Sequence, residues 1–578
     1  MKILGLSFDY HDAAAALIID GKIIAAETEE RFTRRKHDQA LPEQAIAFCL
    51  SEAGLSPSDL DRVMFYENTT LKLDRILRDA KKGSSHQQSL DPVIDKWVIQ
   101  DKFFPLARIA DHLGLPESRV NHVDHHASHA ASAFFASPFR EAVIVTLDGV
   151  GEYETASVSV GSKGRITKLY SQNVPHSLGL FYSALTAYLG FEVNEGEYKV
   201  MGMAGFGSPR YQTILAELFD LSPENGFRLD QASFDFSSIS SCAYTQLLID
   251  KLGPPRVPES DFSPLSEDEN GQRSRHYADI AASTQAVAEQ VILDYVQKAC
   301  KASGLNRVCL AGGVALNSLA NRRLEKELGI ELFVQPAAGD AGGALGAAYL
   351  GEFSDKLVQA PPLSTALLGM HYDSEAIRPL IRRNLKRRTQ EYNDWPSLLD
   401  AAAELIAQGQ VIGWFQSRAE WGPRALGARS ILANPTAPDM KDRVNRKVKF
   451  REPFRPFAPS VLTEKASLYF DVEESVPPAH PECFMLSIAP VRENYRLKLP
   501  AITHVDGTAR LQRVHREANP LYYNLIEAVG IRTGIPMVLN TSFNLRGEPI
   551  VCTPQDALAT FSFSDIDALV IDKMIIRK

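Results

Sequence analysis

Three histidines lie close together in the stretch DHHASHAA, which begins at residue 124. The small residues around them predict a helix, and His125 and His129 are four residues apart, so their rings share one helix face and can hold a metal ion. A carboxylate must complete such a site, and Asp340 in the turn PAAGDAGG is a candidate. This ligand set suits Fe(II), Zn or Mn without distinguishing them. In the alternative interpretation, Asp340 caps a helix and the histidines are solvated or core residues.

Glycine turns follow two expected strands. Gly149 and Gly151 follow the strand at 142–148, and Gly312-Gly313 follows the strand RVCLA. Such turns present backbone N–H groups and helix N-termini to phosphates, although a glycine after a strand is more often only a turn. No GxxxxGK[ST] stretch occurs, which excludes a P-loop enzyme.

The pair His11-Asp12 closes the first expected strand, where a two-lobed ATPase would have its phosphate turn. A histidine in such a turn is suited to act as a general base near neutral pH. A solvated turn histidine is the simpler interpretation.

The segment from residue 424 to residue 455 has the clearest excess of positive charge, because it contains nine Lys or Arg residues and only three acidic residues. In an acidic chain this excess predicts a local anion site, and Arg forks suit phosphate oxygens. The polar run that begins at Asn540 adds neutral donors. The alternative is an ordinary solvated basic helix at 441–449.

The elements that must position these residues repeat along the chain. A strand at 2–8 precedes a hairpin around Asp20-Gly21, and the same plan recurs at 142–170, with a hairpin around 161–164. This repetition predicts a duplicated, two-lobed α/β unit, to which the strand, glycine turn and helix at 307–328 belong.

A Pro-containing, weakly periodic linker follows this unit. We expect residues 1–355 to form the first domain, 356–368 the linker and 369–578 a second α/β domain. In the second domain we expect a helix at 396–408, a strand at 410–415, and strands near 456–462, 483–488 and 536–540.

The composition fits a cytoplasmic, multidomain globular enzyme. Of 578 residues, 45% are hydrophobic and 23% charged, and the net charge of −9 argues against a nucleic-acid partner. Six cysteines without a CxxC pair predict neither a zinc ribbon nor a disulfide framework. No apolar run reaches the roughly 18 residues that a membrane helix needs.

The chain resembles the NodU/CmcH family of O-carbamoyltransferases, which includes antibiotic and toxin carbamoyltransferases. The matching stretches run in family order from residue 5 to residue 554. They include HDAAAALIIDG, EERFTRRKHD, DHHASHAASAFF, VTLDGVGE, LAGGVALN, QPAAGDAGGALGAA, EWGPRALGARSI, KFREPFRPFAPS and LNTSFNLRGEPIVCTP.

The resemblance implies a two-lobed actin-like ATPase (ASKHA) domain, similar to the tRNA threonylcarbamoyl transferase, followed by a YrdC-like α/β domain. The YrdC-like domain would convert carbamoyl phosphate and ATP, with Mg, into carbamoyl adenylate and pyrophosphate. The actin-like domain would then transfer the carbamoyl group to a hydroxyl of a small-molecule acceptor, as in antibiotic and other secondary-metabolite biosynthesis.

The resemblance also assigns site residues. It implies catalysis by His11, with Asp12 and Arg35 at the acceptor, and an iron ion held by His125, His129, Asp148 and Asp340. The nucleotide would contact Gly149, Gly151, Lys199, Gly312, Gly313 and Asn317. Carbamoyl phosphate and ATP would bind Arg424, Lys449, Arg455, Arg510, Asn540 and Ser542.

Other functions remain as alternatives. Threonylcarbamoylation of tRNA needs a polyanion-binding surface that the net charge does not favour, and hydrogenase maturation typically carries CxxC zinc modules that are missing here. An actin-like scaffold without activity leaves the HHxxH stretch and the basic segment unexplained. The acceptor cannot be identified from the sequence, and a homodimer is only the base-rate expectation.

Overall fold

The structure is a computed structural model that describes all residues except 83–90, 237–241, 354–359, 386–387 and 450–456. The described chain forms two compact units. The first unit comprises Met1–Asp9, Ala16–Lys22 and Ala53–Pro361, and the second comprises Tyr10–Ala15, Ile23–Glu52 and Pro362–Lys578. Two short N-terminal stretches therefore fold with the C-terminal part of the chain.

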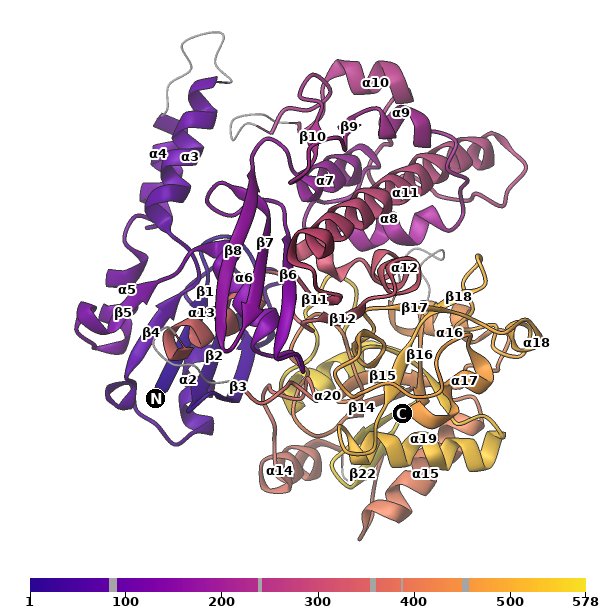
Figure 1. Cartoon of the computed structure of the whole chain (residues 1–578). Helices are drawn as coiled ribbons and strands as arrows, with labels where there is room; N and C mark the ends of the chain where they lie inside the picture. The colour runs from indigo at the N-terminus through magenta and orange to yellow at the C-terminus, as the bar shows by residue number, and fades with distance from the viewer. Residues whose placement is uncertain (83–90, 237–241, 354–359, 386–387, 450–456) are drawn as a thin grey trace. The chain divides into compact units, whose positions relative to one another are not determined.

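The first sheet has the strand order β3-β2-β1-β4-β5 (Figure 1). Its strands are β1 (Lys2–Ser7), β2 (Ala14–Ile19), β3 (Lys22–Thr28), β4 (Arg62–Phe65) and β5 (Val120–His122). β1 runs parallel to β4, and β4 runs parallel to β5. All but the first residue of β1 are buried, as expected for a central strand that is covered on both faces.

The second sheet repeats this plan with the order β8-β7-β6-β11-β12 (Figure 1). Its strands are β6 (Glu141–Leu147), β7 (Glu154–Ser162), β8 (Arg165–Asn173), β11 (Arg307–Ala311) and β12 (Glu331–Val334). β6, β7 and β8 form antiparallel pairs, whereas β11 is parallel to both β6 and β12. The two sheets confirm the duplicated α/β plan predicted from the sequence.

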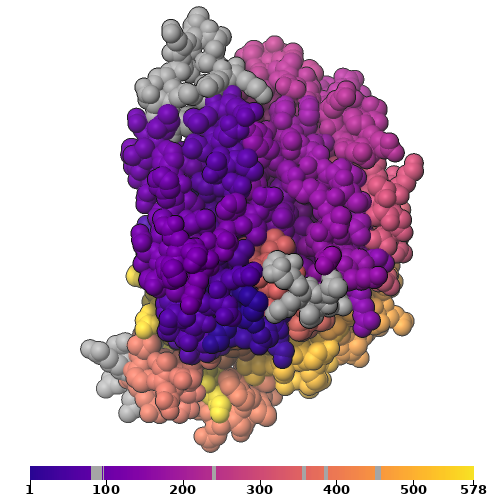
Figure 2. Space-filling view, turned by 60° about the vertical axis from the view of Figure 1, so that its left-hand side comes forward, coloured from indigo at the N-terminus to yellow at the C-terminus, as the bar shows by residue number. Residues whose placement is uncertain are grey.

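The first unit also contains helices along most of its length. They include α3 (Thr69–Lys82), α4 (Asp91–Ile99), α5 (Pro105–Leu113), α6 (His125–Phe134), α7 (Leu178–Tyr188), α8 (Glu197–Ala204), α9 (Gln212–Ala216), α10 (Gln246–Leu252), α11 (Glu269–Ser303), α12 (Ser318–Leu328) and α13 (Asp340–Phe353). In the space-filling view, the indigo and purple N-terminal segments of this unit are at the left and its magenta segments are at the upper right (Figure 2).

Two helices of small residues, α6 and α13, pack closely against each other. The contact depends on Gly346, because a Cβ atom there would lie 1.7 Å from the carbonyl oxygen of Ser128. Only a residue without a side chain permits this distance. The close packing brings the first turn of α6 beside the first residue of α13, where Asp340 begins the helix rather than preceding it.

The second unit contains a sheet of order β13-β22-β21-β14-β15-β20-β16-β19. Its strands are β13 (Thr389–Glu391), β14 (Ile412–Phe415), β15 (Arg429–Ala433), β16 (Ala458–Leu462), β19 (Gln512–Val514), β20 (Met537–Ser542), β21 (Ala568–Ile571) and β22 (Met574–Arg577). Its helices include α1 (Glu29–Thr33), α2 (Glu43–Glu52), α14 (Ser374–Leu385), α15 (Trp395–Ala407), α16 (Met440–Val444), α19 (Pro520–Thr533) and α20 (Pro554–Phe563).

Separate apolar clusters cover the two faces of this sheet. One cluster joins Trp414 and Val538 to helices α15 and α19. The other joins Phe415 and Leu539 to Met440 of α16. Neighbouring strand residues enter different clusters because successive side chains of a strand point to opposite faces. The α/β class predicted from the sequence is therefore confirmed.

One predicted strand is wrong. Residues 483–488 do not form a strand, because Pro481–Phe484 is a short 3₁₀-helix whose N-cap residue, His480, accepts a hydrogen bond from the N–H of Glu482. Pro481 supplies a fixed φ at the first helical position. The strand begins only at Ile488, as β17 (Ile488–Pro490), which pairs with β18 (Thr508–Arg510). Among the described helices, none combines the length and apolar character needed to cross a membrane.

Candidate functional site

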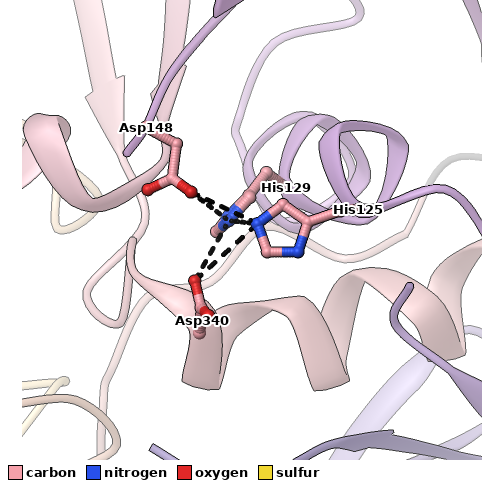
Figure 3. A group of neighbouring side chains, drawn as sticks. All are labelled: His125, His129, Asp148 and Asp340. Carbon is pink, nitrogen blue, oxygen red and sulfur yellow. Dashed lines mark hydrogen bonds and ion pairs between the residues drawn. The ribbon is translucent and has the colours of Figure 1, made fainter. Parts of the chain in front are cut away.

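Four buried side chains of the first unit converge on one point (Figure 3). His125 and His129 come from the first turns of α6, Asp148 follows the end of β6, and Asp340 begins α13. Helical spacing places both histidine rings on one face of α6. The structure thus brings together the four residues that the family resemblance assigns to a metal.

The distances within this cluster fit a bound cation. Nε2 of His125 lies 3.1 Å from Nε2 of His129 and 3.3 Å from Oδ2 of Asp148. Oδ1 of Asp340 lies 3.8 Å from Nε2 of His125 and 3.6 Å from Nε2 of His129. Atoms at these spacings surround a centre about 2 Å from each of them, which is the usual length of a metal bond to nitrogen or oxygen.

The charges of the cluster also fit a divalent cation. Burial lowers the pKa of His125, but the hydrogen bond to Asp148 and the charges of Asp340 and Asp148 raise it to about 9. Two buried carboxylates therefore hold a compensating positive charge. A divalent ion with two neutral imidazoles would neutralise both carboxylates, whereas one protonated histidine neutralises only one, and the ion would displace the proton of His125.

The third histidine of the stretch has a different role. His126 is buried, and its Nδ1 lies 3.1 Å from Oγ of Ser157 on β7. Burial and the neighbouring charge of His125 lower the pKa of His126, which keeps it neutral. Its ring therefore belongs to the packing of α6 against the second sheet.

Neighbouring groups orient the cluster. The N–H of Gly313 donates to Oδ1 of Asp148 over 2.8 Å, so Oδ2 faces the histidines. The turn reaches this position because Gly312 has a φ of +88°, and a Cβ atom there would lie 2.2 Å from the carbonyl oxygen of Leu147. Glu152 accepts a hydrogen bond from the N–H of His125 over 2.9 Å and so fixes the start of α6.

The residues assigned to the nucleotide lie in turns and helix ends of the first unit. Oγ of Ser177 donates to the carbonyl of Gly149 over 2.7 Å, and the N–H of Gly151 donates to the carbonyl of Glu154 over 2.9 Å. These bonds shape the turn after β6, next to Asp148.

Two further residues of the assigned nucleotide site lie on helices. Asn317 is the N-cap of α12, and its Oδ1 accepts a hydrogen bond from Gln285 over 2.9 Å. Lys199 lies on α8 with its Nζ 5.7 Å from the centre of the Phe191 ring. A contact of 3.8 Å between Met201 and Ser318 joins α8 to α12, so the elements that carry Lys199 and Asn317 are neighbours.

In the second unit, the ammonium group of Lys449 is held by several hydrogen bonds. Nζ of Lys449 donates to Oγ of Ser542 over 3.0 Å and to Oδ1 of Asn544 over 2.6 Å. Asn540 donates to the carbonyl of Ala425 over 3.0 Å, which places it beside the loop that carries Arg424. The side-chain amide of Asn540 also donates to Ser460 and Gln512, so its N–H groups are used by neighbouring buried residues.

The remaining assigned arginines differ in position. Arg510 is half-buried on β18, in the two-stranded sheet rather than the large one. Arg424 is half-buried in the loop before β15. Arg455 lies outside the described residues. Binding of carbamoyl phosphate or ATP by this set stays a prediction.

His11 and Asp12 fold with the second unit. Nδ1 of His11 donates to Oδ2 of Asp12 over 2.9 Å, and Nδ1 of His37 donates to Oδ1 of the same carboxylate over 2.7 Å. Arg35 does not join them, because it forms an ion pair of 2.9 Å with Asp38 and its side chain is 69% exposed.

Sequence reasoning missed several groups of these sites. His37 lies in the matched stretch EERFTRRKHD, yet the family pattern assigned no role to it. Glu67 lies 4.0 Å from Nδ1 of His125, and Gln285 holds Asn317. Glu67 and Gln285 are distant in the sequence from the residues that they contact, so no spacing of residues could indicate these contacts.

Comparison with known proteins defines the class of enzyme. The family model described as "Carbamoyltransferase N-terminus" matches residues 2–349, and the one described as "Carbamoyltransferase C-terminus" matches residues 403–578. The chain belongs to the carbamoyltransferase family, whose members are enzymes that transfer carbamoyl groups. The resemblance stated from the sequence is confirmed.

Individual relatives match along most of their length. The chain is 42% identical to an uncharacterised protein of Synechocystis over 100% of this chain and 96% of that protein. It is 38% identical to the nodulation protein NolNO of Sinorhizobium fredii over 98% of this chain and 79% of the relative. It is 39% identical to the nodulation protein NolO of Bradyrhizobium diazoefficiens over 79% of each.

Solved structures give a much weaker match. Component A of the (R)-2-hydroxyglutaryl-CoA dehydratase of Acidaminococcus fermentans is 16% identical, with a TM-score of 0.34 over 60% of this chain and 96% of that chain.

Proposed function

We propose that the protein is an ATP-dependent O-carbamoyltransferase that acts on a small hydroxylated metabolite. In the first step, carbamoyl phosphate is hydrolysed by water to carbamate and phosphate, and the carbamate attacks the α-phosphate of ATP, with Mg, to give carbamoyl adenylate and pyrophosphate. In the second step, an acceptor hydroxyl attacks the carbamoyl carbon, and AMP leaves. This proposal extends the family assignment to a nucleotide, an intermediate and an acceptor class.

The buried cluster of His125, His129, Asp148 and Asp340 is the observation that carries the proposal. It lies next to the turns after β6 and β11, because the N–H of Gly313 in the second turn donates to Asp148 at the end of β6. A divalent cation, which we propose to be Fe(II), would supply positive charge for the phosphate of the adenylate. Burial makes such a charge more effective, because the local dielectric constant is low.

The assigned residues of the second unit support adenylate formation there. Carbamoyl phosphate is a small dianion and ATP brings further negative charge, so several cationic side chains must bind them together. Lys449 is buried, and the carbonyl, hydroxyl and amide oxygens of Ser542 and Asn544 hold its ammonium group in place. The ammonium group thus supplies a positive charge at a fixed position, and an incoming phosphate would replace one of these oxygen acceptors.

The second step needs a base for the acceptor hydroxyl, and we assign this role to His11. The Asp12 carboxylate accepts the Nδ1 hydrogen of His11. The lone pair of the ring is then on Nε2, which can take a proton from a hydroxyl group. This arrangement parallels the way a carboxylate orients the base of a hydrolytic triad.

Pyrophosphate release tests the first step. The purified protein, loaded with Fe(II), is supplied with Mg-ATP, with and without carbamoyl phosphate. We expect release that depends on carbamoyl phosphate. Equal release in both reactions, or none even with a pool of hydroxylated compounds present, would contradict the proposal.

The substitution His11→Asn tests the second step. Asparagine keeps a donor for Asp12 near the position of Nδ1 but offers no basic nitrogen at the position of Nε2. We expect carbamoylation of a hydroxylated compound, followed by mass spectrometry, to fall by about 100-fold or more, with pyrophosphate release retained. Loss of both steps would remove His11 from the role of base.

A further inference from the structure

Asp12 joins two histidines from different segments of the second unit. Its Oδ2 accepts from Nδ1 of His11 over 2.9 Å, and its Oδ1 accepts from Nδ1 of His37 over 2.7 Å. The side chains of His11, Asp12 and His37 are 20%, 30% and 29% exposed, so a small molecule can reach them. Both oxygens of one carboxylate are therefore used to hold imidazole rings.

The hydrogen positions follow from the acceptor. An ionised carboxylate only accepts hydrogen bonds, so both Nδ1 atoms must carry hydrogen. Burial raises the pKa of Asp12, but the hydrogen bonds from His11 and His37 outweigh burial and hold the pKa well below its ordinary value. Asp12 is thus ionised at any working pH. Among the described residues, none bonds the buried Nε2 of His37, which fits a ring with its hydrogen on Nδ1.

The backbone at this link is held in an unusual conformation. Asp12 and His37 both have a φ of 54°, in the left-handed region that residues with a side chain rarely adopt. The N–H of Ala13 donates to the carbonyl of Asp38 over 2.8 Å and joins the two segments. The N–H of His37 donates to Glu30 over 2.9 Å and fixes the turn that carries His37. Strain of this kind persists only where surrounding contacts fix it, and it is frequent at active sites.

We propose that His37 is a positioning residue for carbamoyl transfer, because it holds the Asp12 carboxylate that fixes the ring and the Nδ1–H tautomer of His11. This inference rests on the proposed function only in the role given to His11. A carboxylate held by one histidine alone can rotate about its side-chain bonds. The hydrogen bond from His37 removes that freedom, so Asp12 presents Oδ2 to His11 in one orientation.

The hydrogen bond from His37 also weakens the effect of Asp12 on His11. A carboxylate that also accepts a hydrogen bond from a second donor stabilises a protonated His11 less. Burial lowers the pKa of His37, and the hydrogen bond and charge of Asp12 reverse this effect and raise it. Removal of His37, whether it is neutral or charged, strengthens the interaction of the Asp12 carboxylate with a protonated His11. We therefore expect His11 to stay protonated to a higher pH. The other charged or titratable groups around the link are Tyr10, Glu30, Arg31 and Lys36.

The test measures the reaction of His11 with diethyl pyrocarbonate at different pH values in the full chain, followed residue by residue by mass spectrometry of peptides. This reagent acylates only the unprotonated imidazole. We expect His37→Leu to move the midpoint of the His11 reaction upward by about one pH unit, as loss of a hydrogen bond to a charged group requires. His37→Asn keeps a donor near the position of Nδ1 and should return the midpoint most of the way. His371→Asn, at an exposed histidine of the same unit, is the matched control.

Three results would overturn the inference. The first is an unchanged His11 midpoint in both His37 variants. The second is an equal shift in both variants, which would mean that the hydrogen-bond donor at position 37 has no effect. A third contradicting result concerns metal, because ligand atoms of Asp12, Glu30 and His37 lie within 4.8 Å of one another. If added Mn²⁺ shields His37 from the reagent and His37→Leu removes one bound equivalent, the group is a cation site instead. The His11 midpoint is measured without substrates, so failure of the carbamoyl-transfer proposal stays distinguishable.

Discussion

At the scale of single residues, one turn of α6 separates histidines with different tasks. His125 and His129 face the two carboxylates, whereas His126 lies about 100° around the helix from His125 and faces Ser157. All three rings are buried, with no more than 2% of each residue exposed. Burial therefore does not identify the ligands, and the direction of the ring does.

This difference predicts the outcome of two matched substitutions. Both His129→Ala and His126→Ala remove a buried imidazole from the same helix, so both should lower the stability of the fold. Only His129→Ala removes a ligand atom, and we expect it to weaken binding of Fe(II) or Zn²⁺ by about 100-fold or more, whereas His126→Ala changes the affinity by less than about 10-fold. Titration of the metal-free protein with either ion measures this difference, and equal affinities would contradict the assignment of the cluster.

The sequence identified part of this site in advance. The spacing of His125 and His129 indicated a shared face, and the turn before a glycine-rich helix indicated Asp340. Asp148 came only from the family resemblance, because an aspartate after a strand has no distinctive spacing. Glu152 could not be predicted, since folding rather than local sequence brings it near. The family resemblance named Ser542 together with Lys449, but the hydrogen bond between them was not predicted.

At the scale of elements, the contact between α6 and α13 positions three of the four cluster residues. Gly346 lies two turns beyond Asp340 and touches the backbone at Ser128, one residue before His129. The separation of the two helices therefore sets the distance between the histidines and Asp340. The small-residue composition of both helices was visible in the sequence, but which face of each would meet the other was not.

The substitution Gly346→Ala tests this dependence. A methyl group 1.7 Å from a carbonyl oxygen must push the helices apart, which we expect to cost about 1–3 kcal/mol of unfolding free energy and to weaken metal binding. Gly339→Ala is the matched control, because no atom lies within 4 Å of a Cβ there. Chemical denaturation and metal titration of both variants measure the two effects. If Gly346→Ala behaves like Gly339→Ala, the helix contact does not control the site.

At the scale of the whole molecule, the second unit is discontinuous in sequence. Residues 10–15 and 23–52 fold with residues 362–578, although more than 300 residues separate them along the chain. Within this unit Arg31 donates to the carbonyl of Gly422 over 2.8 Å, and Arg34 donates to the carbonyl of Ile550 over 2.7 Å. Composition and periodicity predicted the duplicated lobes because each repeat is local, but they carry no signal for a unit assembled from distant segments.

Production of residues 362–578 as a separate fragment tests whether the second unit needs its N-terminal stretches. A fragment of residues 362–578 loses the hydrogen bonds that Arg31 and Arg34 donate to the carbonyls of Gly422 and Ile550. A hydrogen bond to a charged group contributes about 1.5–3 kcal/mol, so we expect the fragment to unfold at a lower temperature alone than in the intact chain. Co-expression with residues 1–361 should restore the unfolding temperature, because it returns both N-terminal stretches. Circular dichroism on heating measures each sample, and a fragment as stable alone as in the intact chain would show that the N-terminal stretches are dispensable for this unit.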